Sequence, residues 1–92
     1  MKPGPVIVTP RGYILRFEPW LPSAGDRFTQ LLVANNRYSI TIETTGPKFD
    51  VFYLEPRTLT WTDAAINVDW AKARTAAAKT YDRVYAGLGQ NL

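Results

Sequence analysis

One helical stretch constrains the fold of this chain more than any other feature. It is DWAKARTAAAKTYDRVYAG, residues 69–87. At 100° per residue, the most apolar stripe of the helix has alanines in its middle and large side chains at both ends. The stripe consists of Ile66, Trp70, Ala73, Ala77, Tyr81, Val84 and Leu88. Because small side chains permit close approach, we expect this stripe to pack on a twisted, aromatic-rich sheet as a core face. The alternative is a helix that fills a partner's groove.

The helix is predicted over residues 63–87. Thr62 or Asp63 can cap its start, and a carboxylate there also suits the positive end of the helix dipole. Asn67 is a competing start. Gly87 suits the left-handed residue that follows many helices, so we expect the helix to end there.

The residues before the helix follow β-strand patterns. The clearest pattern is FTQLLVANNRYSITIETTG at residues 28–46, where Asn35 and Asn36 separate two β-rich runs and suit a two-residue hairpin turn. Glycine and proline bound further strand-like runs, which are PVIVT (5–9), GYILRFE (12–18), KFDVFYLE (48–55) and the short RTLTW (57–61).

These patterns predict a single domain over residues 1–92 with an α+β fold. Residues 12–61 form an antiparallel β-meander of four or five strands, and the C-terminal helix packs on it. The sequence leaves open whether the sheet closes in a barrel-like or sandwich-like manner. Residues 1–10 are an extended N-terminal arm or an edge strand, because their prolines cannot donate hydrogen bonds to a central ladder.

The composition excludes most catalytic chemistry. The chain has no Cys and no His, which excludes thiolate or imidazole zinc sites, cysteine nucleophiles and Ser-His-Asp triads. Its eight Asp and Glu residues are dispersed, without the spacing of a metal-binding loop. No glycine-rich loop opens a helix to cradle phosphate. We therefore expect no enzyme activity, no cofactor and no small-molecule substrate.

The positive charge is modest. A net charge of +3 falls short of the basic stripe that indicates nucleic-acid binding. Lys72, Lys79 and Arg83 lie opposite the alanine stripe, interleaved with Asp69 and Asp82, which can form i,i+3 ion pairs with the two lysines. We interpret this face as solvated. A face that tracks phosphates, and hence nucleic-acid binding, is an alternative that we favour less.

The strand KFDVFYLE is apolar on both of its faces. Phe49, Val51 and Tyr53 lie on one face, and Phe52 and Leu54 lie on the other. One helix covers only one face of a sheet, so the second face is either buried by curling of the sheet or offered to a partner. The predicted partner-binding residues come from this second face and from the arm: Val6, Ile7, Val8, Phe52 and Leu54.

The leading functional hypothesis is a non-enzymatic protein–protein interaction module. Its role would be that of a small structural subunit in a multi-copy assembly, such as a virus or phage particle. The alternative is a small inhibitor, for example a phage-encoded anti-defence protein, that binds one host protein. No apolar run approaches the ~20 residues of a membrane helix, and none suits a signal peptide. We therefore expect a cytoplasmic protein, or one incorporated into a virion assembled there, that binds a protein partner or itself.

Overall fold

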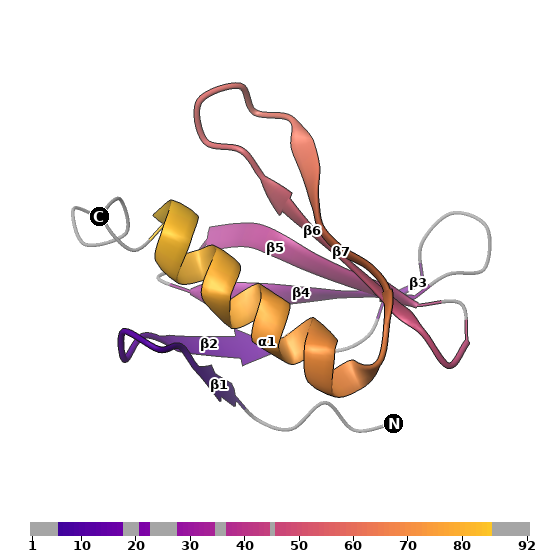
Figure 1. Ribbon diagram of the computed structural model, residues 1–92. Coiled ribbons are helices and arrows are strands. Elements are labelled where there is room, and N and C mark those ends of the chain that lie inside the picture. Colours follow the sequence, from indigo (N-terminus) through magenta and orange to yellow (C-terminus); the bar gives the residue numbers. More distant parts are fainter. Residues whose placement is uncertain (1–5, 18–20, 23–27, 35–36, 45, 86–92) are drawn as a thin grey trace.

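The computed structural model describes residues 6–17, 21–22, 28–34, 37–44 and 46–85. For residues 21–22, 28–34 and 37–39 it describes the backbone and its strand pairing, and not the side chains. These residues form seven strands and one helix that closes in a π-helical turn (Figure 1). The elements are β1 (Val6–Val8), β2 (Ile14–Phe17), β3 (Leu21–Pro22), β4 (Phe28–Ala34), β5 (Arg37–Thr44), β6 (Phe49–Leu54), β7 (Trp61–Val68), α1 (Trp70–Thr80) and the π-helical turn Tyr81–Tyr85. The predicted hairpin turn at Asn35–Asn36 lies outside the described residues. The predicted end of the helix at Gly87 lies outside them as well.

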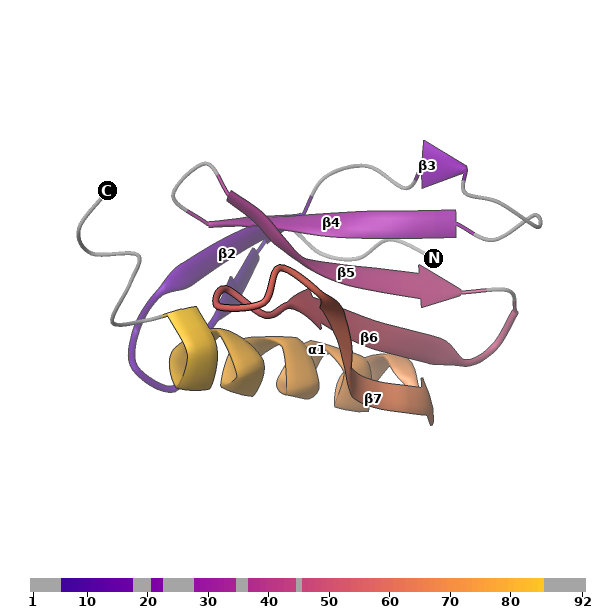
Figure 2. The same ribbon diagram turned by 90° about the horizontal axis from the view of Figure 1, so that it is seen from above.

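The strands form one antiparallel sheet in the order β1-β2-β4-β5-β6-β7, with β3 also paired to β4. β2 and β3 share one edge of β4, because β5 pairs along the whole of its other edge. α1 crosses one face of this sheet (Figures 1 and 2). The predicted α+β class, with a meander and one packed C-terminal helix, is confirmed. The described strands form an open sheet that ends at β1 and β7, without closing into a barrel.

The predicted helix start at residue 63 is wrong. Residues 61–68 form strand β7, which pairs antiparallel with β6, and the helix begins at Trp70. Asn67 has a φ of 57°, which no right-handed helix contains. Asp69 is the N-cap, because its Oδ1 accepts a hydrogen bond from the Lys72 backbone N–H at 2.8 Å. Ala64 and Ala65 favour a helix, but pairing with β6 gives the backbone N–H and C=O groups of β7 hydrogen-bond partners. This pairing outweighs the helix propensity of the two alanines.

The hydrophobic core lies between α1 and the sheet. Its buried residues are Ile7, Leu15, Ile40, Ile42, Phe49, Val51, Ala73, Ala77, Ala78, Tyr81 and Tyr85. The alanine stripe is therefore a core face, as predicted. The aromatic side chains at its ends also reach over the sheet: the Trp70 ring centroid lies 4.9 Å from that of Phe49, and Tyr81 lies 5.4 Å from Tyr13. Ile66, which was predicted to belong to this stripe, is instead exposed on β7.

The π-helical turn anchors the C-terminal end of the helix. Its i→i+5 hydrogen bonds make a wider turn than those of an α-helix, and both Tyr81 and Tyr85 are buried. The Tyr85 hydroxyl donates a hydrogen bond to the carbonyl of Leu54. This bond joins the helix to the end of β6, from which the β6–β7 hairpin extends away from the helix (Figure 1).

Candidate protein-interaction surface

The sheet face opposite α1, here called the helix-free face, carries apolar side chains from β6 and β7. Phe49 and Val51 are buried under the helix, so the alternating Phe52 and Leu54 lie on the helix-free face, where both are half-buried. Leu54 is paired across the strands with Trp61, whose side chain is 54% exposed. Phe52, Leu54 and Trp61 together form an apolar strip. The strip contains both residues that the sequence predicts on this face.

A shallow hollow of about 370 Å³ adjoins the apolar strip. It is lined by Thr41, Glu43, Phe52 and Trp61. Thr41 is buried and lies directly across from Phe52 in the β5–β6 pair, so the floor of the hollow is packed. The hollow therefore has two aromatic walls, a packed floor and a carboxylate at its rim.

The tip of the β6–β7 hairpin adds an exposed leucine. The connection is closed by hydrogen bonds from the Glu55 N–H to the Thr60 carbonyl, 2.9 Å, and from the Leu59 N–H to the Glu55 carbonyl, 2.7 Å. Leu59 has a φ of 57° and is 71% exposed. A left-handed conformation costs a non-glycine residue about 1–2 kcal/mol, and burial does not offset that cost here. The left-handed conformation belongs to the turn that the Leu59 N–H itself closes.

The N-terminal segment is an edge strand of its own domain in the part that the structure describes. β1 pairs with β2 from Val6 opposite Arg16 to Val8 opposite Ile14, and the Val6 carbonyl accepts a hydrogen bond from Arg74 Nη2 at 3.0 Å. Ile7 is 6% exposed and belongs to the core, so its side chain is not accessible to a partner. Val8 is 62% exposed. With the exposed Ile14 it forms a second apolar patch on the helix-free face.

The five predicted partner-binding residues thus lie in different places. Phe52 and Leu54 lie in the apolar strip near one end of the sheet, and Val8 lies in the second patch near the other end. Val6 is half-buried on β1, and Ile7 is in the core. Sequence reasoning missed Trp61 and Leu59. The sequence did contain a pattern that could have predicted the strand, because the aromatic and β-branched residues of WTDAAINV favour β-structure. In the structure the first residue of that strand, Trp61, pairs with Leu54 and faces the same way.

The basic helix face is exposed, as predicted, but the expected ion pairs do not form among the described residues. Asp69 caps the helix through the Lys72 backbone. Asp82 Oδ2 accepts a hydrogen bond from the Arg11 backbone N–H at 2.8 Å, instead of pairing with Lys79. Both carboxylates therefore accept hydrogen bonds from backbone N–H groups. The fold already holds such a donor in place, so bonding to it costs less side-chain entropy than ordering a mobile lysine side chain would.

Within the described ranges, no group of three or more Asp, Glu, His or Cys side chains is placed to hold a metal ion. No helix there has the length and apolar character needed to cross a membrane. Comparisons with family models, curated proteins and solved structures give no match to this chain.

Proposed function

We propose that this chain is a non-enzymatic protein–protein interaction module that self-associates through its helix-free face, as a small structural subunit of a multi-copy assembly does. The exposure of Trp61 beside the half-buried Phe52 and Leu54 supports this proposal most strongly. Burying one large apolar side chain contributes about 1.5–3 kcal/mol. Tryptophan is also among the residues that most often dominate interface energies.

A second copy of the chain suits this face because the face is self-complementary. It carries an apolar patch at each end, Val8 with Ile14 at one and the apolar strip at the other. The exposed Arg16 neighbours the first patch, and Glu43 and Asp63 neighbour the strip. Two copies packed face to face about a twofold axis would set β1–β2 of each against β6–β7 of the other. That arrangement buries both apolar patches and brings opposite charges together.

The test is sedimentation equilibrium of the parent chain and of the variant Trp61→Ala, from micromolar to near-millimolar concentration. We expect the parent to form a dimer or larger species and Trp61→Ala to weaken self-association about tenfold or more, which corresponds to about 1.4 kcal/mol. The control is Thr75→Ala, because Thr75 is exposed on α1, on the opposite side of the sheet from the apolar strip. We expect it to associate like the parent.

Two outcomes contradict the proposal. A parent chain that stays monomeric at every concentration would exclude self-association. The inhibitor hypothesis would then predict a stoichiometric complex with one host protein through the same strip. Equal weakening by Thr75→Ala and Trp61→Ala would show that the contact does not depend on the apolar strip.

A further inference from the structure

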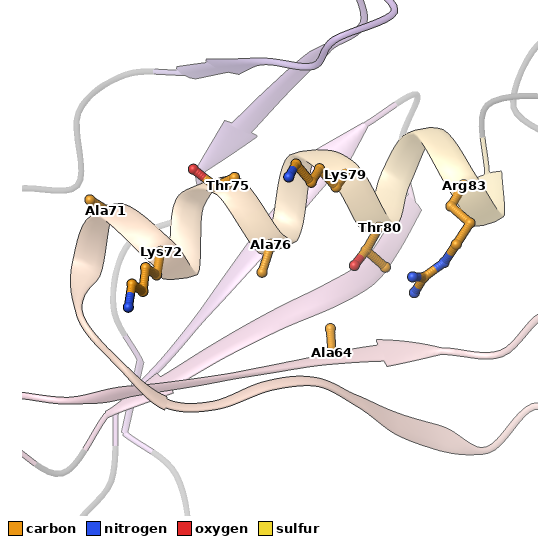
Figure 3. Close-up of a pocket in the computed structure, with 8 residues that line it drawn as sticks. All are labelled: Ala64, Ala71, Lys72, Thr75, Ala76, Lys79, Thr80 and Arg83. Carbon is orange, nitrogen blue, oxygen red and sulfur yellow. The ribbon is translucent and has the colours of Figure 1, made fainter.

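A second surface lies on the other side of the sheet, in a groove of about 420 Å³ between α1 and β7 (Figure 3). In Figure 3 the side chains of Lys72 and Arg83 extend from the two ends of the helix toward the strand. Small side chains lie between them, with Ala76 and Thr80 on the helix and Ala64 on the strand. The groove therefore has a narrow, mostly apolar floor with a cation at each end.

The floor of the groove depends on a β-bulge in β7. Val51 is paired with Ala65 and Phe52 with Asp63, so Ala64 is an extra residue that has no partner on β6. A bulge redirects side chains, and here both Ala64 and Ala65 pack against the core on the helix side. An alanine at this position leaves open the space between strand and helix that a larger side chain would fill.

The charged side chains that line the groove have one sign. Lys72, Lys79 and Arg83 line it and are exposed, and no acidic side chain lines it. In the described part of the chain none of the three forms an ion pair. Asp63, the nearby acid on β7, is paired with Phe52 and lies on the helix-free face. The guanidinium of Arg83 lies 5.9 Å from the centroid of the Tyr53 ring, a cation–π contact that orients it.

The groove also borders a free sheet edge. β7 is the last strand of the sheet, and no described strand pairs with its outer edge. Such an edge presents backbone N–H and C=O groups that can pair with another chain. From Lys72 to Arg83 the helix rises about 16 Å at 1.5 Å per residue. That length matches about five residues of an extended chain at 3.3 Å each.

We infer that this groove binds an extended, acidic peptide segment of a partner protein, which adds itself to the outer edge of β7. Alternate side chains of the added strand would face α1, where carboxylates would contact Lys72, Lys79 and Arg83 over the small floor residues. A polypeptide fits better than a nucleic acid for two reasons. The free backbone edge offers regular pairing to a peptide, and no aromatic side chain lines the groove as a platform for base stacking.

The test is fluorescence anisotropy with a labelled heptapeptide, Glu-Val-Glu-Val-Glu-Val-Glu, at low salt. The comparison ligands are the same peptide with Lys in place of Glu and a single-stranded oligothymidylate. Lys72→Glu/Arg83→Glu reverses the cations at the two ends of the groove. The control, Arg11→Glu/Lys48→Glu, makes the same change in net charge at two exposed residues outside the groove. We expect the first variant to weaken binding of the acidic peptide about tenfold or more and the control to change it less than about threefold.

Amide hydrogen exchange tests the strand addition separately. Saturation with the acidic peptide should slow exchange of β7 amides at Trp61–Val68. Circular dichroism of both variants checks that they remain folded. No saturable binding of the acidic peptide, equal loss in the charge-matched control, unchanged β7 exchange on binding, or tighter binding of oligothymidylate than of the peptide would each overturn the inference. Self-association depends on the helix-free face and peptide binding depends on the groove on the other side of the sheet, so this test and the self-association test fail independently.

Discussion

At the residue scale, the helix–sheet contact depends on the size of the alanine side chains. Ala73 and Ala77 are fully buried against the sheet, and larger rings pack only toward the ends, where Trp70 lies against Phe49 and Tyr81 against Tyr13. A small side chain in the middle permits close approach of the helix axis, and the aromatic rings then fill the wider space at the ends.

We predict that Ala77→Leu destabilises the fold by about 1–3 kcal/mol, because the close contact has no space for three more carbon atoms. Urea denaturation followed by circular dichroism measures the change. Ala71→Leu is the matched control, because Ala71 is exposed on the same helix and its replacement should alter the free energy of unfolding by less than about 0.5 kcal/mol. An unfolding free energy for Ala77→Leu equal to or above that of the parent would refute the close-packed alanine face.

At the element scale, β1 is joined to the rest of the domain in three ways. It pairs with β2, it places Ile7 in the core, and its Val6 carbonyl accepts a hydrogen bond from Arg74 on the helix. Just beyond the strand, Thr9 Oγ1 accepts a hydrogen bond from the Tyr13 N–H at 3.0 Å. These contacts favour the edge-strand interpretation of the N-terminal segment over that of an arm reaching another subunit.

Two neighbouring substitutions test the role of β1. Ile7→Ala should lower the free energy of unfolding by about 2–5 kcal/mol, because it leaves a cavity between the helix and β1. Val8→Ala, one residue along the same strand and facing solvent, should change it by less than about 0.5 kcal/mol. Thermal and urea denaturation of both variants measures the difference. Equal small effects would mean that β1 contributes little to the domain, and the intersubunit arm would again be the better interpretation.

At the scale of the whole molecule, one core joins the helix to the sheet. Buried side chains of β1, β2, β5 and β6 meet those of the helix in a single cluster, so neither layer buries its apolar face without the other. A shared core makes unfolding of the two layers cooperative.

Native-state hydrogen exchange should reveal this cooperativity. We expect the slowest amides of α1 and those of β5 and β6 to exchange with the same free energy of opening, equal to that of global unfolding. Amides at the tip of the β6–β7 hairpin should open locally at lower free energy, because the tip is exposed. Two distinct free energies for the helix and the central strands would instead show that the layers unfold separately.

Much of the local structure follows from side-chain periodicity. Alternation along KFDVFYLE placed Phe49 and Val51 on one face and Phe52 and Leu54 on the other, and the structure has the same division. The period of the helix likewise identified Ala73 and Ala77 as core residues. These predictions succeed because the geometry of a single strand or helix alone determines which side chains share a face.

The sequence alone did not place the candidate sites, because they depend on contacts between distant segments. Residues 61–68 contain both helix-favouring alanines and strand-favouring Trp61, Ile66 and Val68, and pairing with β6 decides in favour of the strand. The pairing of β7 with β6 puts Trp61 beside Leu54 and brings Ala64 under the helix to form the groove. The sequence by itself determined which faces are apolar. Only the tertiary structure decided which are covered, because burial depends on the strands and helix that long-range pairing brings to each face.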